Sequence, residues 1–299
     1  MMSSLPTLRI LGSGSSGNLA ILDLPDPAGG GDPPRHLIID LGLGPRTTRT
    51  RLNRHGGQLA LDRVIGVLAT HADQDHLRRS WAHTITCHRW PVYAAPSHHA
   101  GLARLGVPAA CLQAVPDLGR SVEITPGIKV SAAIAPHDDH GTSAYRIEIT
   151  TSQESCISLG WATDLGRFTT PVQRLLEGCD SLAIESNYDP ELQSMSSRPP
   201  FLKRRITGGH GHLSNLEALE AVLQLARHRE PSLIALLHLS RDCNHPELVQ
   251  RLWEGRAPGL VGRLHLAHAT VPLPTLRLGR GVSAEETPPE ARFAETLWS

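Results

Sequence analysis

The chain is poor in aromatic residues and carries no excess of charge of either sign. Of its 299 residues, only 4% are Phe, Trp or Tyr, so aliphatic side chains and alanine must fill most of the core. The formal net charge at pH 7 is zero. This balance argues against a broad basic surface that binds nucleic acid indiscriminately, but it allows a local basic groove.

Cysteine is scarce, and long apolar runs are absent. The five cysteines are Cys87, Cys111, Cys156, Cys179 and Cys243. They are odd in number and form no C-x-x-C pair, which is typical of reduced thiols in a cytoplasmic protein. No charged-then-apolar leader opens the sequence, and no apolar run approaches the length of a membrane span. We therefore expect a soluble cytoplasmic protein that has no membrane partner.

Short apolar runs alternate with a few amphipathic segments along the chain. Strands are predicted at 8–11, 19–24, 36–40, 64–70, 92–94, 128–135, 144–150, 156–163, 181–185 and 233–238. Helices are predicted at 171–177, 214–228 and 246–253, and the Pro/Gly-rich segment 25–34 reads as a hairpin connection. The pattern indicates one α/β or α+β domain over residues 1–279. Residues 280–299 mix Ser, Glu and Pro without periodicity and read as a flexible tail.

The segment from Thr70 to His76 is the most informative part of the chain. It places four potential metal ligands in six residues, directly after an apolar run that reads as a buried strand. The four are His71, Asp73, Asp75 and His76. Imidazole nitrogens and carboxylate oxygens suit zinc, manganese or iron, so the segment predicts a metal site at the end of this strand.

This segment resembles the T-H-x-H-x-D-H motif of the metallo-β-lactamase superfamily, except that Asp73 stands where the second histidine is expected. Further matches follow in the order of that superfamily, each at the end of a predicted strand. They are Asp40, His137, Asp164 and His238. The resemblance covers nearly the whole chain and implies a four-layer αβ/βα sandwich, with the site along one edge where two sheets meet.

Several other blocks resemble the YycJ/WalJ branch of this superfamily. They are the Gly/Ser loop at 12–18 and the segments 185–189, 201–206, 211–215, 238–240 and 244–247. That branch is associated with DNA exonuclease activity on phosphodiesters. The resemblance thus implies a nucleic acid substrate, with DNA favoured, and leaves the oligomeric state open.

The resemblance also implies two divalent ions, zinc or manganese and alternatively iron, that share and ionise a water molecule. The first ion would be held by His71, Asp73, His137 and a shared Asp164. The second would be held by Asp75, His76, His238 and the same Asp164. Asp40 would hydrogen-bond a ligand histidine and fix its orientation.

The carboxylate at Asp73 would move the metal preference from zinc toward manganese or iron. In the alternative, the first ion is weak or absent and Asp73 only forms a hydrogen bond nearby.

The resemblance implies that Asp75 and His212 take part in catalysis. His212 would stabilise or protonate the leaving oxygen. Near His212, Ser214 and Asn215 begin a predicted helix and would cradle a phosphate. Ser214 is also a plain helix cap, with Glu217 completing a capping box. Lys203 and Arg205, with Arg204 between them, would line a track for backbone phosphates, although such charges are commonly just solvated.

The sequence therefore predicts a metal-dependent hydrolase, foremost a phosphodiesterase that acts as a DNA exonuclease. One alternative is hydrolysis of a small lactone, thioester or cyclic phosphodiester by the same metal pair. Another, from a different class, is a non-catalytic metal-binding regulator.

Overall fold

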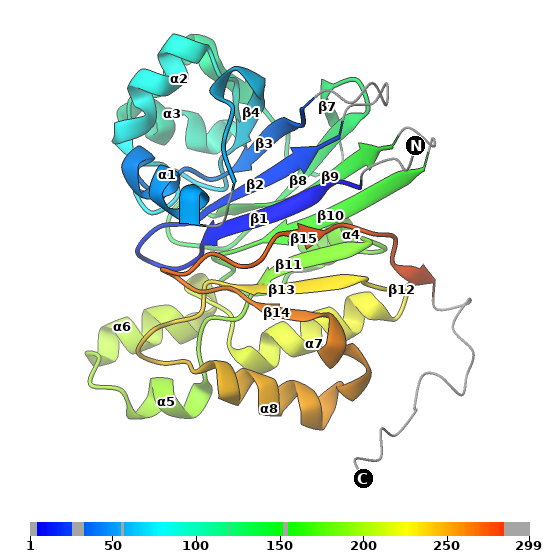
Figure 1. The fold of residues 1–299 in the computed structure, drawn as a ribbon. Helices are drawn as coiled ribbons and strands as arrows, with labels where there is room; N and C mark the ends of the chain where they lie inside the picture. The colour runs from blue at the N-terminus through cyan, green and yellow to red at the C-terminus, as the bar shows by residue number, and fades with distance from the viewer. Residues whose placement is uncertain (1–4, 26–32, 55–56, 119, 152–154, 284–299) are drawn as a thin grey trace.

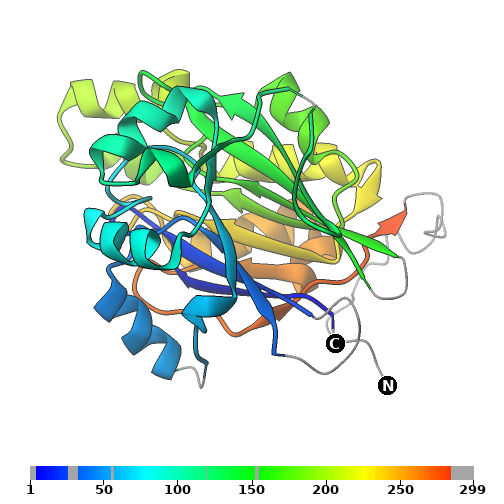
Figure 2. The ribbon, with the colours of Figure 1, turned by 90° about the horizontal axis from the view of Figure 1, so that it is seen from above.

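The computed structural model describes residues 5–25, 33–54, 57–118, 120–151 and 155–283. Two seven-stranded sheets lie face to face, and helices cover the outer face of each (Figures 1 and 2). The predicted four-layer sandwich is confirmed. No helix in the described part of the chain has the length and apolar character needed to cross a membrane.

The first sheet is built mainly from the first half of the chain, in the order β15-β1-β2-β3-β4-β5-β6. Its strands are β1 (Thr7–Gly12), β2 (Leu19–Leu24), β3 (Arg35–Ile39), β4 (Val64–Leu68), β5 (Val92–Ala94), β6 (Leu112–Ala114) and β15 (Leu276–Arg277). Strands β2 and β3 are antiparallel neighbours, so the predicted hairpin is confirmed, although residues 26–32 lie outside the described residues. From β3 to β6 the pairing is parallel.

The second sheet has the order β14-β13-β11-β10-β9-β8-β7. Its strands are β7 (Val122–Thr125), β8 (Ile128–Ala135), β9 (Thr142–Thr150), β10 (Cys156–Ala162), β11 (Ser181–Glu185), β13 (Leu233–Leu237) and β14 (Leu264–Leu266). Strands β7 to β10 pair antiparallel, whereas β10, β11, β13 and β14 pair parallel. The carboxyl ends of β8, β10, β11 and β13 therefore lie at one edge.

Helices complete the two outer layers. The first sheet is covered by α1 (Pro45–Arg54), α2 (Ala82–His88) and α3 (Pro96–Arg104), and the second by α4 (Thr170–Leu176), α7 (Asn215–Ala226) and α8 (Pro246–Arg256). The 3-10 turns are η1 (Leu61–Arg63), η2 (Arg79–Trp81), η3 (Ala109–Cys111) and η5 (Pro258–Arg263). Ser214 caps α7 and forms the predicted capping box with Glu217.

Two further features lie away from the sheet faces. Helices α5 (Pro190–Met195) and α6 (Pro200–Arg205), continued by η4 (Ile206–His210), form a pair beside the strand ends (Figure 1). A short ladder joins β12 (Arg229–Glu230) to β16 (Val282–Ser283). The folded body thus extends beyond residue 279, where the tail was predicted to begin. The rest of that tail, 284–299, lies outside the described residues.

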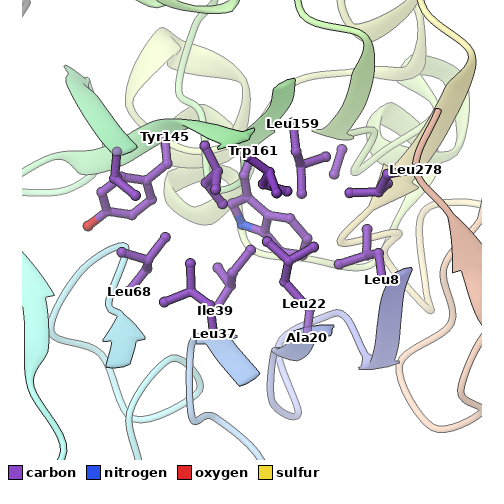
Figure 3. Packing of buried hydrophobic residues seen from close by; sticks show 14 of the residues in the cluster. Leu8, Ala20, Leu22, Leu37, Ile39, Leu68, Tyr145, Leu159, Trp161 and Leu278 are labelled. Atoms are coloured by element: carbon purple, nitrogen blue, oxygen red, sulfur yellow. The ribbon is translucent and has the colours of Figure 1, made fainter. Parts of the chain in front are cut away.

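The central core lies between the two sheets. Figure 3 shows Leu8, Leu22 and Leu37 of the first sheet facing Leu159 and Trp161 of the second. The cluster is mostly aliphatic, as the scarcity of aromatics predicted. Because this cluster contains side chains from both sheets, its burial holds the two sheets together.

Candidate active site

Strand ends and the turns after them bring the predicted metal ligands together. Asp40 follows β3, Asp164 follows β10 and His238 follows β13 after one or two residues. All three have positive φ, at 58°, 57° and 55°. This left-handed conformation is uncommon outside glycine, although Asp, Asn and His adopt it more often than other residues. It turns the chain sharply at the point where each strand stops.

The loop from Thr70 to His76 is held by backbone hydrogen bonds on both sides. Asn18 N donates to Asp75 O (2.8 Å) and Leu41 N donates to His76 O (2.6 Å). Gly42 lies so close that a Cβ there would be 1.7 Å from the carbonyl oxygen of Asp75. Only glycine fits at this crossing, and the loop is fixed against the turn that follows β3.

Asp40 is fully buried and hydrogen-bonds the His76 ring. Its Oδ2 lies 2.7 Å from His76 Nδ1, and Oδ1 accepts from Thr70 N at 2.9 Å. A carboxylate accepts, so Nδ1 carries the proton and Nε2 is directed elsewhere. His76 Nε2 lies 3.0 Å from Asp164 Oδ2 and 3.8 Å from Asp75 Oδ2.

Asp164 lies at the centre of the site. Its Oδ2 faces His76, while its Oδ1 lies 3.0 Å from His238 Nδ1 and 3.6 Å from His212 Nδ1. The carboxylate therefore touches histidines from both sheets through different oxygens. This is the placement a bridging carboxylate needs.

Glu185 is a site residue whose role was not predicted, although it begins the segment 185–189 that resembles the YycJ/WalJ branch. It is fully buried at the end of β11, and its Oε1 lies 2.7 Å from His212 Nδ1 and 3.1 Å from His238 Nδ1. Its Oε2 accepts from Leu165 N at 2.7 Å. Glu185 ends a predicted strand, as Asp40 does, but its contact with the two histidines depends on which strands lie beside β11.

A second group of donors forms around His71. Donor atoms of His71, Asp73 and His137 lie within 4.8 Å of one another. The His71 and Asp73 side chains approach to 3.7 Å, and Asp73 is half exposed. His137 Nδ1 donates to Gly211 O (2.9 Å), which leaves its Nε2 for a ligand.

Charge inside the site favours cations. Burial alone would lower the pKa of His238, but Asp164 and Glu185 raise it to about 10. Burial opposes the charge on His76 in the same way, and Asp40 with Asp164 raises its pKa well above the usual value. The pKa of Asp164 is lowered because His238 and His76 outweigh its burial. Protons on histidines thus offset carboxylates that would otherwise be buried without counter-charge.

The donor set fits divalent metal ions. Three groups of His, Asp and Glu donors each lie within 4.8 Å, and Asp164 belongs to two of them. In addition, His238 Nε2 is a buried nitrogen for which no hydrogen-bond partner is found among the described residues. Nitrogen and oxygen donors of this kind suit zinc, manganese or iron.

A cavity of about 470 Å³ opens over these side chains. His71, Asp73, Asp75, His137, Asp164, His212 and His238 all line it. The same cavity is lined by Arg198, Leu202, Arg205 and Ile206 from the α5–α6 region. Arg205 pairs with Asp138, with its Nη2 2.6 Å from Oδ2, and Arg198 lies 3.2 Å from Asp242.

Three residues expected to contact substrate have other partners. Ser214 bonds Glu217 as a cap, Asn215 Oδ1 accepts from Ser186 Oγ (2.7 Å), and Lys203 Nζ donates to Ser194 O (2.6 Å). None of these three is among the described residues that line the cavity. The polar groups of these three residues are thus bonded to other parts of the protein and do not face the cavity.

The comparisons with known proteins agree with this geometry. The family described as "Beta-lactamase superfamily domain" matches residues 35–238, which is more than half of the chain. The chain belongs to the metallo-β-lactamase superfamily. The match begins at β3, just before Asp40, and ends at His238, so it spans the strand-end residues of the site.

This superfamily member is similar to two proteins named as exodeoxyribonucleases. YycJ from Bacillus anthracis is 27% identical over 272 residues, 89% of this chain and 96% of the relative. WalJ from Streptococcus pneumoniae strain D39 is 27% identical over 250 residues, 80% of this chain and 83% of the relative. The predicted likeness to the YycJ/WalJ branch is confirmed.

The fold is also that of a solved structure, the metallo-β-lactamase fold protein YhfI from Bacillus subtilis. It superposes with a TM-score of 0.62 at 14% identity, covering 90% of this chain and 99% of YhfI. The chain is therefore a hydrolase of the metallo-β-lactamase superfamily, and the substrate has to be argued from its own side chains.

Proposed function

We propose that this hydrolase is a phosphodiesterase that degrades DNA as an exonuclease. The observation that carries the proposal is Asp164, whose two oxygens face histidines from different sheets, inside a cavity that Arg198 and Arg205 also line. The two relatives named as exodeoxyribonucleases match 80% and 89% of the chain and support the choice of substrate.

The proposal includes two divalent ions, zinc or manganese and alternatively iron. His71, Asp73 and His137 would hold one, and Asp75, His76 and His238 the other, with Asp164 shared. When bound, such a pair supplies Lewis acidity and lowers the pKa of a coordinated water to about 7. Glu185 joins the donor set, because it belongs to the same group as Asp164, His212 and His238.

His212 is the proposed proton donor to the leaving oxygen. Its Nδ1 lies 2.7 Å from Glu185 Oε1, and this contact fixes the orientation of the ring. The side chain is 21% exposed and lines the cavity, so the ring is open to a substrate. Asp75 lines the same cavity 3.8 Å from His76 and is the proposed partner of the attacking water.

Arg198 and Arg205 are the proposed phosphate contacts. Each lines the cavity and is held by a carboxylate, Asp242 or Asp138 respectively, so that the guanidinium is already in place. A positioned guanidinium matches the geometry of a phosphate oxygen pair. All five cysteines are free thiols, which supports the cytoplasm as the proposed location.

A substrate panel tests the proposal. End-labelled DNA, a nitrophenyl phosphodiester, a lactone and a thioester are each incubated with manganese and with zinc. The proposal expects turnover of the DNA and the phosphodiester, and loss of that turnover in His76→Ala. His36→Ala is the matched control, because His36 is also buried and paired with an aspartate, but outside the site.

Turnover of the lactone or thioester alone would favour the small-molecule hydrolase instead. Metal uptake without turnover of any substrate would favour the regulator. Binding of DNA should also weaken as salt rises, because each neutralised phosphate releases counterions.

A further inference from the structure

Phe201 is an aromatic side chain exposed to solvent. It is 67% exposed, and within the described ranges it is the only aromatic among the large apolar residues that are exposed. Few residues of this chain are aromatic, and the larger rings, such as those of Trp161 and Trp253, are buried in the hydrophobic cores. Single exposed apolar side chains are common on proteins, so the role of this ring is argued from what lies beside it.

The position of Phe201 connects it to the active-site cavity. It lies on α6, whose next turn carries Arg205, four residues on. Residues four apart lie on the same side of a helix, with Cβ atoms about 5–6 Å apart. Arg205 lines the cavity, as do Leu202 and Ile206 of the same segment. Phe201 is therefore about one helical turn from the cavity rim.

Positive charge accompanies the ring. Lys203, Arg204 and Arg205 occupy the last turn of α6, in a chain whose net charge is zero. Arg204 is exposed and, within the described part of the chain, forms no ion pair. Phe201 and Arg204 thus place an exposed ring and an exposed cation three residues apart on the helix that also contributes residues to the cavity.

We propose that Phe201 stacks on a base of a single-stranded nucleic acid end, while Arg204 neutralises a neighbouring phosphate. This inference rests on the proposed function, because the scissile diester would lie in the cavity. An exposed ring binds any base through its π-face, and cations beside it follow the backbone. In a duplex, stacking covers both faces of every base pair except the terminal ones, so a single strand offers more open base faces to this surface.

Binding and cleavage by Phe201→Ala and Phe201→Trp test the inference. Fluorescence anisotropy with a phosphorothioate single strand, which resists cleavage, reports affinity. The ratio of kcat/KM for a single-stranded oligonucleotide to kcat/KM for a nitrophenyl phosphodiester reports coupling to the site. Leu118→Ala is the matched control, since Leu118 is 65% exposed and does not line the cavity.

For Phe201→Ala we expect about a tenfold loss in single-strand affinity and in the kcat/KM ratio, with little change for duplex DNA. Phe201→Trp should retain or improve both. If Phe201→Ala matches Leu118→Ala while the parent cleaves DNA, the inference fails and the proposed function stands. A parent that neither binds nor cleaves nucleic acid overturns both.

Discussion

The buried pair of Asp40 and His76 offers a sharp test of how the site prepares its ligands. Asp40→Asn keeps the shape of the side chain, and Asn tolerates the positive φ of 58° at this position. The variant oxygen can still accept from Thr70 N, where Asp40 Oδ1 now accepts at 2.9 Å. The amide nitrogen then faces His76 Nδ1, in place of an oxygen 2.7 Å away.

An amide can only donate at that point, so Nδ1 must become the acceptor and the ring proton must move to Nε2. A protonated Nε2 cannot ligate a metal ion. Both side chains are fully buried, so water cannot replace the lost partner. We expect metal affinity to fall 10- to 100-fold, which is about 1.4 to 2.7 kcal/mol.

Metal affinity is measured by calorimetric titration of the metal-free protein, alongside its thermal unfolding. Asp23→Asn is the matched control, because Asp23 also bonds a histidine Nδ1 at 2.7 Å, on His36, outside the site. An Asp40→Asn protein that folds and binds metal as tightly as the parent would refute the argument that Asp40 sets the tautomer.

Three other outcomes follow from the structure. Asp73→His should keep the metal count and shift preference toward zinc, which elemental analysis after competition would show; one ion per chain before and after would contradict the two-ion site. Asp180 accepts from Ser158 N (2.9 Å) and Arg229, which lower its pKa despite burial. Asp180→Asn should therefore lower the free energy of unfolding in urea by about 2 kcal/mol at neutral pH. The difference should disappear in acid, because the parent carboxylate is then protonated. An equal loss at both pH values would contradict this. Leu159→Ala, fully buried between the sheets, should cost about 3 kcal/mol in the same assay.

The strand-end residues were predictable because apolar runs and the polar residues after them are local patterns. Glu185 shows the limit of such patterns. Its importance depends on β11 lying between β10 and β13, so that its carboxylate falls between His212 and His238. That pairing is a tertiary fact, and no spacing in the chain encodes it directly.

The helices over the first sheet were not predicted, for a related reason. Helix α1 (Pro45–Arg54) is rich in Arg and Thr and buries only Thr48 and Leu52. Two buried positions four residues apart give too narrow a stripe to read as amphipathic. Which face of α1 is buried depends on how the helix packs against the first sheet, and the sequence pattern does not show this.

The proposed metal ligands come from both sheets, and this has a consequence for folding. Among them, His71 and His76 belong to the first half of the chain, and Asp164 and His238 to the second. A metal ion that is bound by residues of both halves can bind only when the two halves are packed together. Its binding energy therefore adds to the free energy of unfolding. At a free concentration of about a hundred times Kd, that linkage is worth about 2.7 kcal/mol. The concentration of available metal ions would then set the stability of the folded enzyme as well as its reaction rate.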